Sequence, residues 1–484
     1  MLEFLNDLLW SKVLIFVLII LGVLFTVRSR FVQFRYFVNM FGILASAFRR
    51  EKGHLSSFQA LALSVAGRVG AGNIAGVAVA VTLGGPGAVF WMWMIGLIGM
   101  ATSFFECTLA QAYKVAEPDG TYRGGPAFYI QRGLRQKWLA MLFSVLLLVT
   151  FGFSFNALQS FTLATSFYDT FGVPTYVSGI VTAAVLGLII FGGIKRIAEV
   201  AEFVVPIMAI GYMAVALFVI GTNIGEVPAV LMYIVTSAFG LEPAIGGGIG
   251  AAILYGVRRG LFSNEAGLGS APNVAAVAYV RHPVNQGIVQ AFSVFIDTLI
   301  LCTCTAMIIL LSGAYEPGVT VGGVSLTQMA LAEHVGEWGR VFVTIALLFF
   351  SFTSIMYNYY LGENSLGFMA GENKTVFNAF RVLTLGLVLW GSMQDLGTVF
   401  AFADVAMGLL ALVNLIAMVL LFKVGLRLMN DYDAQRAAGN PQPVFDAAKF
   451  ADLDLDHAAW RDVATRESGL QPRPDDAAPV RTAF

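Results

Sequence analysis

Two glycine-rich segments carry polar residues in the middle of otherwise apolar stretches of the chain. The first runs from Val69 to Gly76 and the second from Arg259 to Pro272. Glycine tolerates positive φ and costs roughly 1 kcal/mol in helix propensity, so both segments are expected to interrupt a helix. An interruption frees carbonyl groups, which suit Na⁺, and N–H groups, which suit a carboxylate. Close packing of helices through small residues is the alternative explanation.

Single polar residues occur inside the other apolar stretches as well. Within a membrane such residues are candidates for function, and the alternative for each is a hydrogen bond or ion pair between helices. Arg68 and Arg259 could form such pairs with Glu106, Asp297 or Glu265. The complete set is Arg68, Glu106, Asn156, Gln159, Glu199, Glu202, Asp297, Asn358, Asp404 and Asn414.

Two adjacent hydroxyl groups, Thr353 and Ser354, fall in the middle of a Phe-rich stretch. Beside freed carbonyl groups they could complete a Na⁺ site of uncharged oxygens, or they could bond back to carbonyls of their own helix. Other kinds of site are not indicated. The four histidines lie far apart without zinc-ligand spacing, and the sequence has no Walker loop and no nucleophile with a base, which argues against an ATP-driven pump and an enzyme.

The composition identifies the environment of these segments. Of 484 residues, 58% are apolar and 12% are charged, and the mean hydropathy is +0.77. An average soluble domain has about 25% charged residues, so this chain is expected to be an all-α protein that crosses a bilayer several times. Its net charge of −1 offers no basic surface for nucleic acid.

Eleven stretches are long and apolar enough to cross a bilayer as helices of about 20 residues. They are roughly 8–27, 55–83, 88–113, 138–167, 174–192, 199–221, 244–279, 286–312, 339–361, 375–392 and 396–422. Lys and Arg gather in alternate loops, whereas the loops 84–87, 169–173, 222–243 and 313–337 contain neither residue. The positive-inside rule then predicts an outer N-terminus and a cytoplasmic C-terminus.

Part of the sequence recurs 191 residues further along the chain. Matched positions are Arg68 with Arg259, Asn73 with Asn264, Gly76 with Gly267, and the acids Glu106 and Asp297. Five predicted spans separate the copies, and an odd number inverts the second copy in the membrane. Inverted repeats built around broken helices are typical of secondary transporters. Convergent membrane composition is the alternative.

Four motifs resemble the signatures of the alanine/glycine:cation symporter family. They are VGAGNIAGVA at 69–78, GGPGAVFWMW at 84–93, GLFSNEAGLGSAP at 260–272 and FIDT at 295–298. The resemblance covers nearly the whole chain. It implies Na⁺-coupled import of small neutral amino acids through a bacterial or archaeal inner membrane. It also implies a leucine-transporter-like fold, with two inverted repeats of five helices and one extra N-terminal helix.

The same resemblance implies roles for residues near the two interruptions. Backbone N–H groups would hold the substrate carboxylate at Ala71, Gly72 and Asn73. The other broken helix and a neighbouring span would line the pocket with Phe262, Ser263, Asn264 and Gln159. The Na⁺ site would combine carbonyl groups near Ala66, Val69 and Phe350 with the hydroxyl groups of Thr353 and Ser354. A second cation could be held by Asn73 and Asp297.

The sequence departs from the family pattern in the pocket. The family usually has Thr where Ala71 stands, and a Gly-Trp pair where Tyr357 and Asn358 stand. Loss of the Trp would enlarge or polarise the pocket, so Asn358 joins the substrate-binding candidates. We expect a secondary importer of a neutral amino acid, larger or more polar than alanine, with Na⁺ as coupling ion and no organic cofactor. There are two alternatives. One is coupling to H⁺ through Glu106, Glu265 or Asp297, and the other is an amino acid sensor with a transporter fold.

The predicted organisation divides the chain into six parts. They are an extra N-terminal helix (1–30), an interfacial helix (31–53), the first repeat (54–221), an interfacial segment (222–243), the inverted repeat (244–424) and a polar cytoplasmic tail (425–484). The tail is expected to be loosely ordered, with short docking through Phe450 and Trp460 at most. The expected partners are the amino acid, Na⁺ and the lipid bilayer, with no obligate protein partner.

Overall fold

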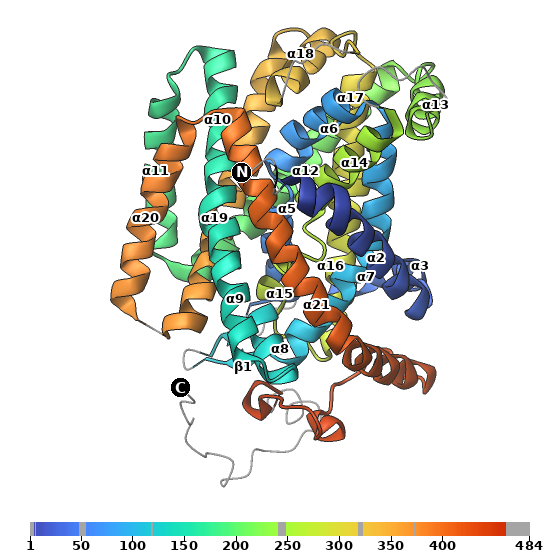
Figure 1. Ribbon diagram of the computed structural model, residues 1–484, viewed down its shortest axis with the longest axis vertical. Coiled ribbons are helices and arrows are strands. Elements are labelled where there is room, and N and C mark those ends of the chain that lie inside the picture. The colour runs from blue at the N-terminus through green and yellow to red at the C-terminus, as the bar shows by residue number, and fades with distance from the viewer. Residues whose placement is uncertain are drawn as a thin grey trace.

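The computed structural model describes residues 4, 6–47, 55–117, 120–240, 248–317, 323–371 and 373–460 (Figure 1). Over these residues it is helical, as predicted, apart from the paired two-residue strands Val115–Ala116 (β1) and Tyr122–Arg123 (β2). Parts of the predicted segments 31–53, 222–243 and 425–484 lie outside the described residues.

Eight helical stretches are long and apolar enough to cross a membrane in the part of the chain that the structure describes. Three are composites: η1 (Asp7–Leu14) with α2 (Ile15–Arg28), α9 (Lys137–Leu147) with η3 (Leu148–Phe155) and α10 (Asn156–Phe171), and α16 (Pro283–Val294) with η4 (Phe295–Cys302) and α17 (Thr303–Leu310). The others are α7 (Gly87–Ala112), α12 (Gly193–Thr222), α19 (Trp338–Ala370), α20 (Lys374–Ser392) and α21 (Leu396–Ala437).

A ninth candidate span consists of two helical pieces bent by 47° at a break. The pieces are α5 (Ser57–Arg68), and η2 (Gly72–Gly76) followed by α6 (Val77–Gly84). The two remaining predicted spans correspond to α11 (Thr175–Ile190), which is apolar but has only 16 residues, and to α14 (Gly248–Asn264) with α15 (Ala271–Ala275). The count of eleven spans therefore stays a prediction.

Short helices lie at the two ends of the helical body. At one end are α13 (Val227–Ala238) and α18 (Val324–Val335), and at the other are α8 (Pro126–Gly133) and the strand β1 (Figure 1). Near the second end are also α3 (Val32–Arg35) and α4 (Phe37–Ala47), which cover part of the predicted interfacial helix. The end with α8 is the one whose loops are rich in Lys and Arg.

The interrupted helices lie among the most buried elements. The helix α7 packs along α14 and α16, and α19 packs against α5, α10 and η3. Nearly every residue from 59 to 81 and from 259 to 278 is buried. Three of the neighbouring segments (η2, η3 and η4) are π-helical, with widened turns that often occur at functional sites.

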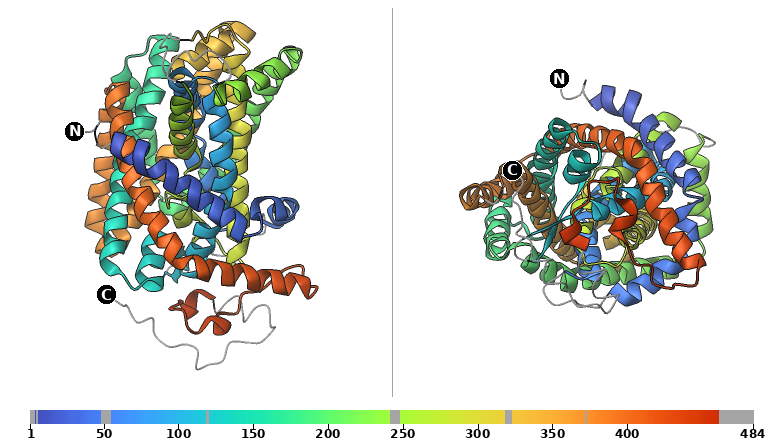
Figure 2. Two further views of the ribbon diagram at one scale, coloured as in Figure 1. Left: turned by 45° about the vertical axis from the view of Figure 1, so that its right-hand side comes forward. Right: turned by 90° about the horizontal axis from the view of Figure 1, so that it is seen from below.

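As far as residue 460, the predicted tail is docked under the body rather than loosely ordered, and the two residues expected to dock, Phe450 and Trp460, are buried. The helix α21 continues to Ala437, past the predicted boundary at 424, and residues 438–460 then fold beneath α7 and α8 (Figure 2). Phe445, Leu455 and Trp460 are buried, and the indole N–H of Trp460 donates to the carbonyl of Ala112 (3.3 Å).

A buried lysine, Lys114, lies against this docked segment. Lys114 follows the end of α7, and its Nζ donates to the carbonyl of Ala278 (3.2 Å). Burial lowers the pKa of Lys114 to about 7. The rings of Tyr122 and Trp460 lie 4.0 and 4.4 Å from the ammonium, and such cation–π contacts favour the charged form.

Replacing Trp460 tests how firmly the segment is docked. Trp460→Ala removes a large buried side chain, which costs about 3 kcal/mol, equivalent to roughly a hundredfold in the docked-to-undocked ratio. Faster tryptic cleavage after Lys449, followed by mass spectrometry, is the expected result. The control is Trp138→Ala, because Trp138 is 66% exposed; equal cleavage rates in the two variants would contradict the prediction.

Candidate functional site

The first interruption lies at Val69–Ala71, slightly earlier than predicted, because Gly72 and Asn73 already belong to η2. Two amide side chains bind its freed N–H groups. The N–H of Ala71 donates to Oε1 of Gln159 (2.9 Å), and the N–H of Gly70 donates to Oδ1 of Asn73 (3.0 Å). The predicted carboxylate-binding N–H of Ala71 is thus bound by a side chain in this structure.

Most of the oxygens predicted for Na⁺ come together beside this interruption. The hydroxyl of Ser354 on α19 donates to the carbonyl of Ala66 (2.9 Å) and to that of Phe350 (2.9 Å). At Val69 the helix ends with ψ of 89°, which turns its carbonyl out of the helical direction. These oxygens carry no formal charge. Unwound backbone carbonyls, which are also uncharged, coordinate Na⁺ in transporters.

Thr353 differs from Ser354, which bonds both to its own helix at Phe350 and to Ala66 on α5. The hydroxyl of Thr353 donates to carbonyl groups of its own helix, at Phe349 (2.9 Å) and Phe350 (3.1 Å). This is the local alternative that the sequence left open. Thr353 is fully buried, and it reaches the oxygen cluster only through the shared carbonyl of Phe350.

Two glycines allow the neighbouring helices to approach the interruption. A Cβ at Gly70 would lie 2.4 Å from Oγ of Ser354 and 2.7 Å from Nε2 of Gln159. A Cβ at Gly67 would lie 2.3 Å from the ring of Tyr357. Any larger residue at either position would therefore displace the groups that surround the oxygens.

A buried carboxylate connects the first interruption to α14. Asp297 in η4 accepts hydrogen bonds from Nδ2 of Asn73 (2.7 Å), from the hydroxyl of Ser263 (2.8 Å) and from that of Thr298 (2.7 Å). Asn73 and Asp297 do meet, as predicted, but Asn73 presents a donor to the carboxylate while its oxygen accepts from Gly70. In this geometry Asn73 does not offer its oxygen to a cation beside Asp297.

The second interruption lies at Glu265–Ser270, within the predicted segment Arg259–Pro272. Phe262, Ser263 and Asn264 still belong to the last turn of α14, so their backbones are not unwound. Positive φ values at Glu265 (55°), Gly267 (93°) and Gly269 (79°) mark the actual interruption.

Carboxylate and amide groups hold this second interruption. Glu106 on α7 accepts the N–H of Gly267 (3.2 Å), and Nδ2 of Asn414 on α21 donates both to Glu106 (3.0 Å) and to the carbonyl of Gly267 (2.9 Å). Glu265 accepts from the hydroxyl groups of Ser270 (2.6 Å) and Tyr357 (3.1 Å). No binding role was expected for Asn414 or Tyr357 from the sequence, although the position of the polar Asn414 within a span was a signal.

Aromatic rings lie between the two interruptions. A Cβ at Gly72 would lie 3.2 Å from the ring of Phe262 and 3.3 Å from Cα of Ser263. Phe262 in turn packs against Phe155 and Phe400, with ring centroids 4.9 and 6.0 Å away. Phe262 and Ser263 therefore do face the first interruption, as predicted.

Two predicted pocket residues have unpartnered amide groups. Nδ2 of Asn264 and Nδ2 of Asn358 are buried and have no hydrogen-bond partner among the described residues. Asn264 accepts the N–H of Ala266 (3.0 Å) and lies close to Gly99 of α7. Buried amides are nearly always paired, so each can take an oxygen from a bound molecule.

The buried arginines do not bond to the acids that the sequence suggested. Arg259 forms an ion pair with Asp404 (2.5 Å), which Arg258 also approaches (3.4 Å). Arg68 donates to the carbonyl of Gln290 (3.1 Å) and to nearby serine hydroxyl groups. The hydrogen bonds to Glu106, Glu265 and Asp297 described above therefore all come from neutral donors.

The fold and the site define a transporter that crosses the membrane several times through broken helices. The chain belongs to the sodium:alanine symporter family, whose profile matches residues 1–447. It is an integral protein of the inner membrane, in a family of carriers rather than enzymes.

Several relatives are similar over almost their whole length. The chain is 49% identical over 442 residues to the probable sodium/glutamine symporter GlnT of Bacillus subtilis, covering 91% of each chain. It is 46% identical over 457 residues to the amino-acid carrier protein AlsT of the same organism, covering 94% and 96%. With the sodium/proton-dependent alanine carrier protein of Bacillus sp. PS3 it shares 39% over 421 residues, covering 83% and 93%.

Among solved structures, a manganese transporter of Eremococcus coleocola has a similar fold. The TM-score is 0.52, the sequence identity is 14%, and the match covers 87% of this chain and 89% of the other. At this identity the match shows the fold alone.

A methyl group at the first interruption should disturb transport. Gly70→Ala places Cβ against Ser354 and Gln159, and overpacking of this kind costs about 1–3 kcal/mol. Substrate uptake by cells that carry normal amounts of the protein should fall by at least about tenfold. The control is Gly211→Ala, because a Cβ at Gly211 has no neighbour within 4 Å; unchanged uptake by Gly70→Ala would refute the expectation.

Proposed function

We propose that the chain is a secondary active importer that couples Na⁺ entry to uptake of a neutral amino acid by alternating access. The observation that carries this proposal is the group of uncharged oxygens of Ala66, Phe350 and Ser354 beside the first interruption. Na⁺ bound there would join α5 to α19. It would thereby favour one conformation and raise substrate affinity by linkage.

The proposed architecture has two inverted repeats of five helices behind an extra N-terminal helix. Two acids at matched positions support it. Glu106, on α7 of the first repeat, binds Gly267 at the second interruption, and Asp297, on η4 of the second repeat, binds Asn73 at the first. Such reciprocal contacts are what a twofold relation between the repeats would produce.

The Na⁺ site is tested with the purified protein in liposomes under an imposed Na⁺ gradient. Ser354→Ala removes an oxygen, and the Na⁺ concentration that gives half-maximal uptake should rise about tenfold, or 1.4 kcal/mol. Thr353→Ala should also raise it, but less, because Thr353 bonds to its own helix. The matched control is Ser365→Ala, another buried serine on α19, which bonds to the carbonyl of Leu361.

The same assay separates the proposal from its alternatives. A Na⁺ response of Ser354→Ala identical to that of Ser365→Ala would remove Ser354 from the ion site. Uptake in the absence of Na⁺ that rises at acid pH would instead favour H⁺ coupling through Glu106, Glu265 or Asp297. The name of the relative from Bacillus sp. PS3 includes both ions. Binding of the amino acid without its counterflow across the liposome membrane would indicate a sensor.

We propose further that the substrate is larger or more polar than alanine. Asn358 lies one helical turn beyond Ser354 on α19, and its buried Nδ2 has no partner among the described residues. It can donate to an oxygen in the substrate side chain, such as an amide carbonyl. The relative with 49% identity is named as a probable sodium/glutamine symporter, which supports glutamine as the first candidate.

Substitution of Asn358 tests this preference. A lost hydrogen bond in a buried site costs about 1–3 kcal/mol, so in Asn358→Ala the concentration of glutamine that halves labelled substrate uptake should rise about tenfold. Alanine, which has no side-chain oxygen, should compete as before. If only alanine and glycine compete strongly for labelled uptake by the wild-type protein, the proposal of a larger or more polar substrate is refuted.

A further inference from the structure

The two interrupted spans meet directly at the end of the molecule whose loops are rich in Lys and Arg. The N–H of Tyr279, shortly after α15, donates to the carbonyl of Leu55, just before α5 (3.1 Å), and Leu55 also forms a parallel bridge with Ala278. The helices α5 and α15 pack against each other and lead from this pair to the two interruptions. Separation of Tyr279 from Leu55 would therefore open a path between α5 and α15 from the interruptions to this end.

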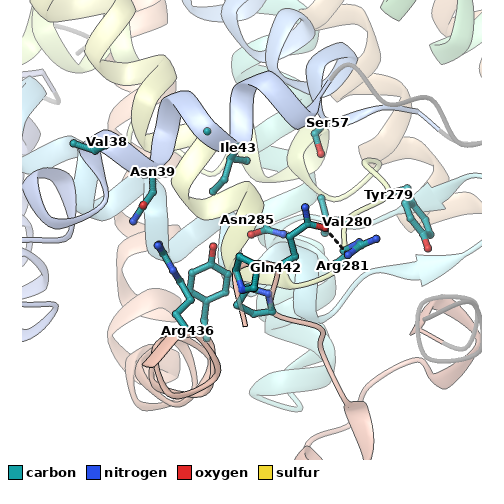
Figure 3. A pocket seen from close by; sticks show the side chains of 14 residues that line it. Val38, Asn39, Ile43, Ser57, Tyr279, Val280, Arg281, Asn285, Arg436 and Gln442 are labelled. Atoms are coloured by element: carbon teal, nitrogen blue, oxygen red, sulfur yellow. Dashed lines mark hydrogen bonds between the residues drawn. The ribbon is translucent and has the colours of Figure 1, made fainter. Parts of the chain in front are cut away.

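A strap, formed by the docked residues 438–460, binds the linker between α15 and α16. The N–H of Phe445 donates to the carbonyl of Arg281 (2.8 Å), and the guanidinium of Arg281 donates to Oε1 of Gln442 (2.5 Å; Figure 3). The ring of Phe445 also lies 5.5 Å from that of His282. The strap thus holds the linker, by backbone and side-chain contacts, immediately after the pair described above.

The strap is fixed to the predicted first repeat as well. Oδ2 of Asp456 accepts the N–H of Ala116 in β1 (2.9 Å), and the indole N–H of Trp460 donates to the carbonyl of Ala112 at the end of α7 (3.3 Å). The rings of Phe445 and Trp460 lie 4.7 Å apart, which joins the two attachments within the strap. Because the strap bonds to both repeats, movement of the linker away from α7 has to break one set of its contacts.

The second interruption forms a hinge directly before α15. Gly267 and Gly269 have φ values of 93° and 79°, and glycine changes its backbone angles at little steric cost. Such positions absorb the change in φ and ψ when a segment of a protein swings. The short helix α15 and residues 276–282 can therefore move together about the interruption, away from α5, unless another part of the chain restrains them.

We propose that the strap is an inhibitory device that keeps this end of the protein closed, by holding α15 and the linker against α5 and α7. The inference rests on the alternating access proposed above. The positive-inside rule assigns this end, with its Lys- and Arg-rich loops, to the cytoplasm. Detachment of the strap shifts the population toward the form that is open to the cytoplasm. Docking of the strap therefore limits release of the substrate into the cell.

Hydrogen–deuterium exchange of the purified full chain, read by mass spectrometry, measures this opening without an ion gradient. Peptides that contain Tyr279 report on the pair, because its N–H exchanges when its hydrogen bond opens. In Trp460→Ala and in Phe445→Ala this exchange should be at least about tenfold faster than in the wild type. The control is Asp452→Asn, which breaks an exposed ion pair with Arg427 (2.6 Å) in the same segment; it should change the exchange rate by less than about twofold.

A second measurement follows α15 itself. Cys107 on α7 is buried against Ala271 and Ala275 of α15. Its thiol should therefore react with a maleimide at least about tenfold faster in Trp460→Ala, because α15 leaves α7 more often. Mass spectrometry of the labelled peptides identifies the cysteine that has reacted.

Two results would overturn the proposal. One is release of the strap in Trp460→Ala, seen as faster exchange at Phe445, with exchange at Tyr279 as slow as in Asp452→Asn. The other is faster exchange at Tyr279 without faster reaction of Cys107, which would confine the effect to the linker. Trp460→Phe keeps an aromatic ring in place and should stay within about threefold of the wild type, which guards against misfolding as the explanation. Failure of Na⁺-driven uptake in liposomes would contradict the proposed function and leave these measurements valid.

Discussion

Backbone N–H and carbonyl groups that are released from a helix within a membrane must find partners inside the protein. This requirement organises the centre of the molecule. At the first interruption, Gln159 and Asn73 accept the N–H groups of Ala71 and Gly70, and at the second Glu106 accepts that of Gly267. Gln159 and Glu106 come from other helices, so these two polar residues within the spans have a structural role at the interruptions.

The partners of the two interruptions are exchanged between the halves of the chain. Asp297 holds Asn73 at the first interruption, and Glu106 holds Gly267 at the second. Tyr357 adds a third connection, because its ring covers Gly67 while its hydroxyl donates to Glu265. Movement at one interruption therefore disturbs the hydrogen bonds of the other. An ion at one and a substrate between them would in this way affect the same contacts.

The sequence predicted the interruptions because glycine and polar residues within an apolar stretch are a local signal. Through the resemblance to a known family, it also predicted that Ser354 lies near Ala66 and that Asn73 lies near Asp297. It did not predict that a non-glycine residue, Glu265, takes a positive φ at the second interruption, because this conformation depends on tertiary contacts. For the same reason, the sequence could not predict that Arg259 pairs with Asp404 rather than with another buried acid. Docking through Phe450 and Trp460 was expected, but the polar composition of the tail gave no signal for the burial of Phe445 and Leu455.

The contact between Ala112 and Trp460 joins positions 348 residues apart. Trp460 is synthesised long after α7, so the aromatic cover of Lys114 by Tyr122 and Trp460 cannot be complete before the chain reaches that residue. A chain that stops short of Trp460 would keep the long helices and lose the indole that lies over Lys114.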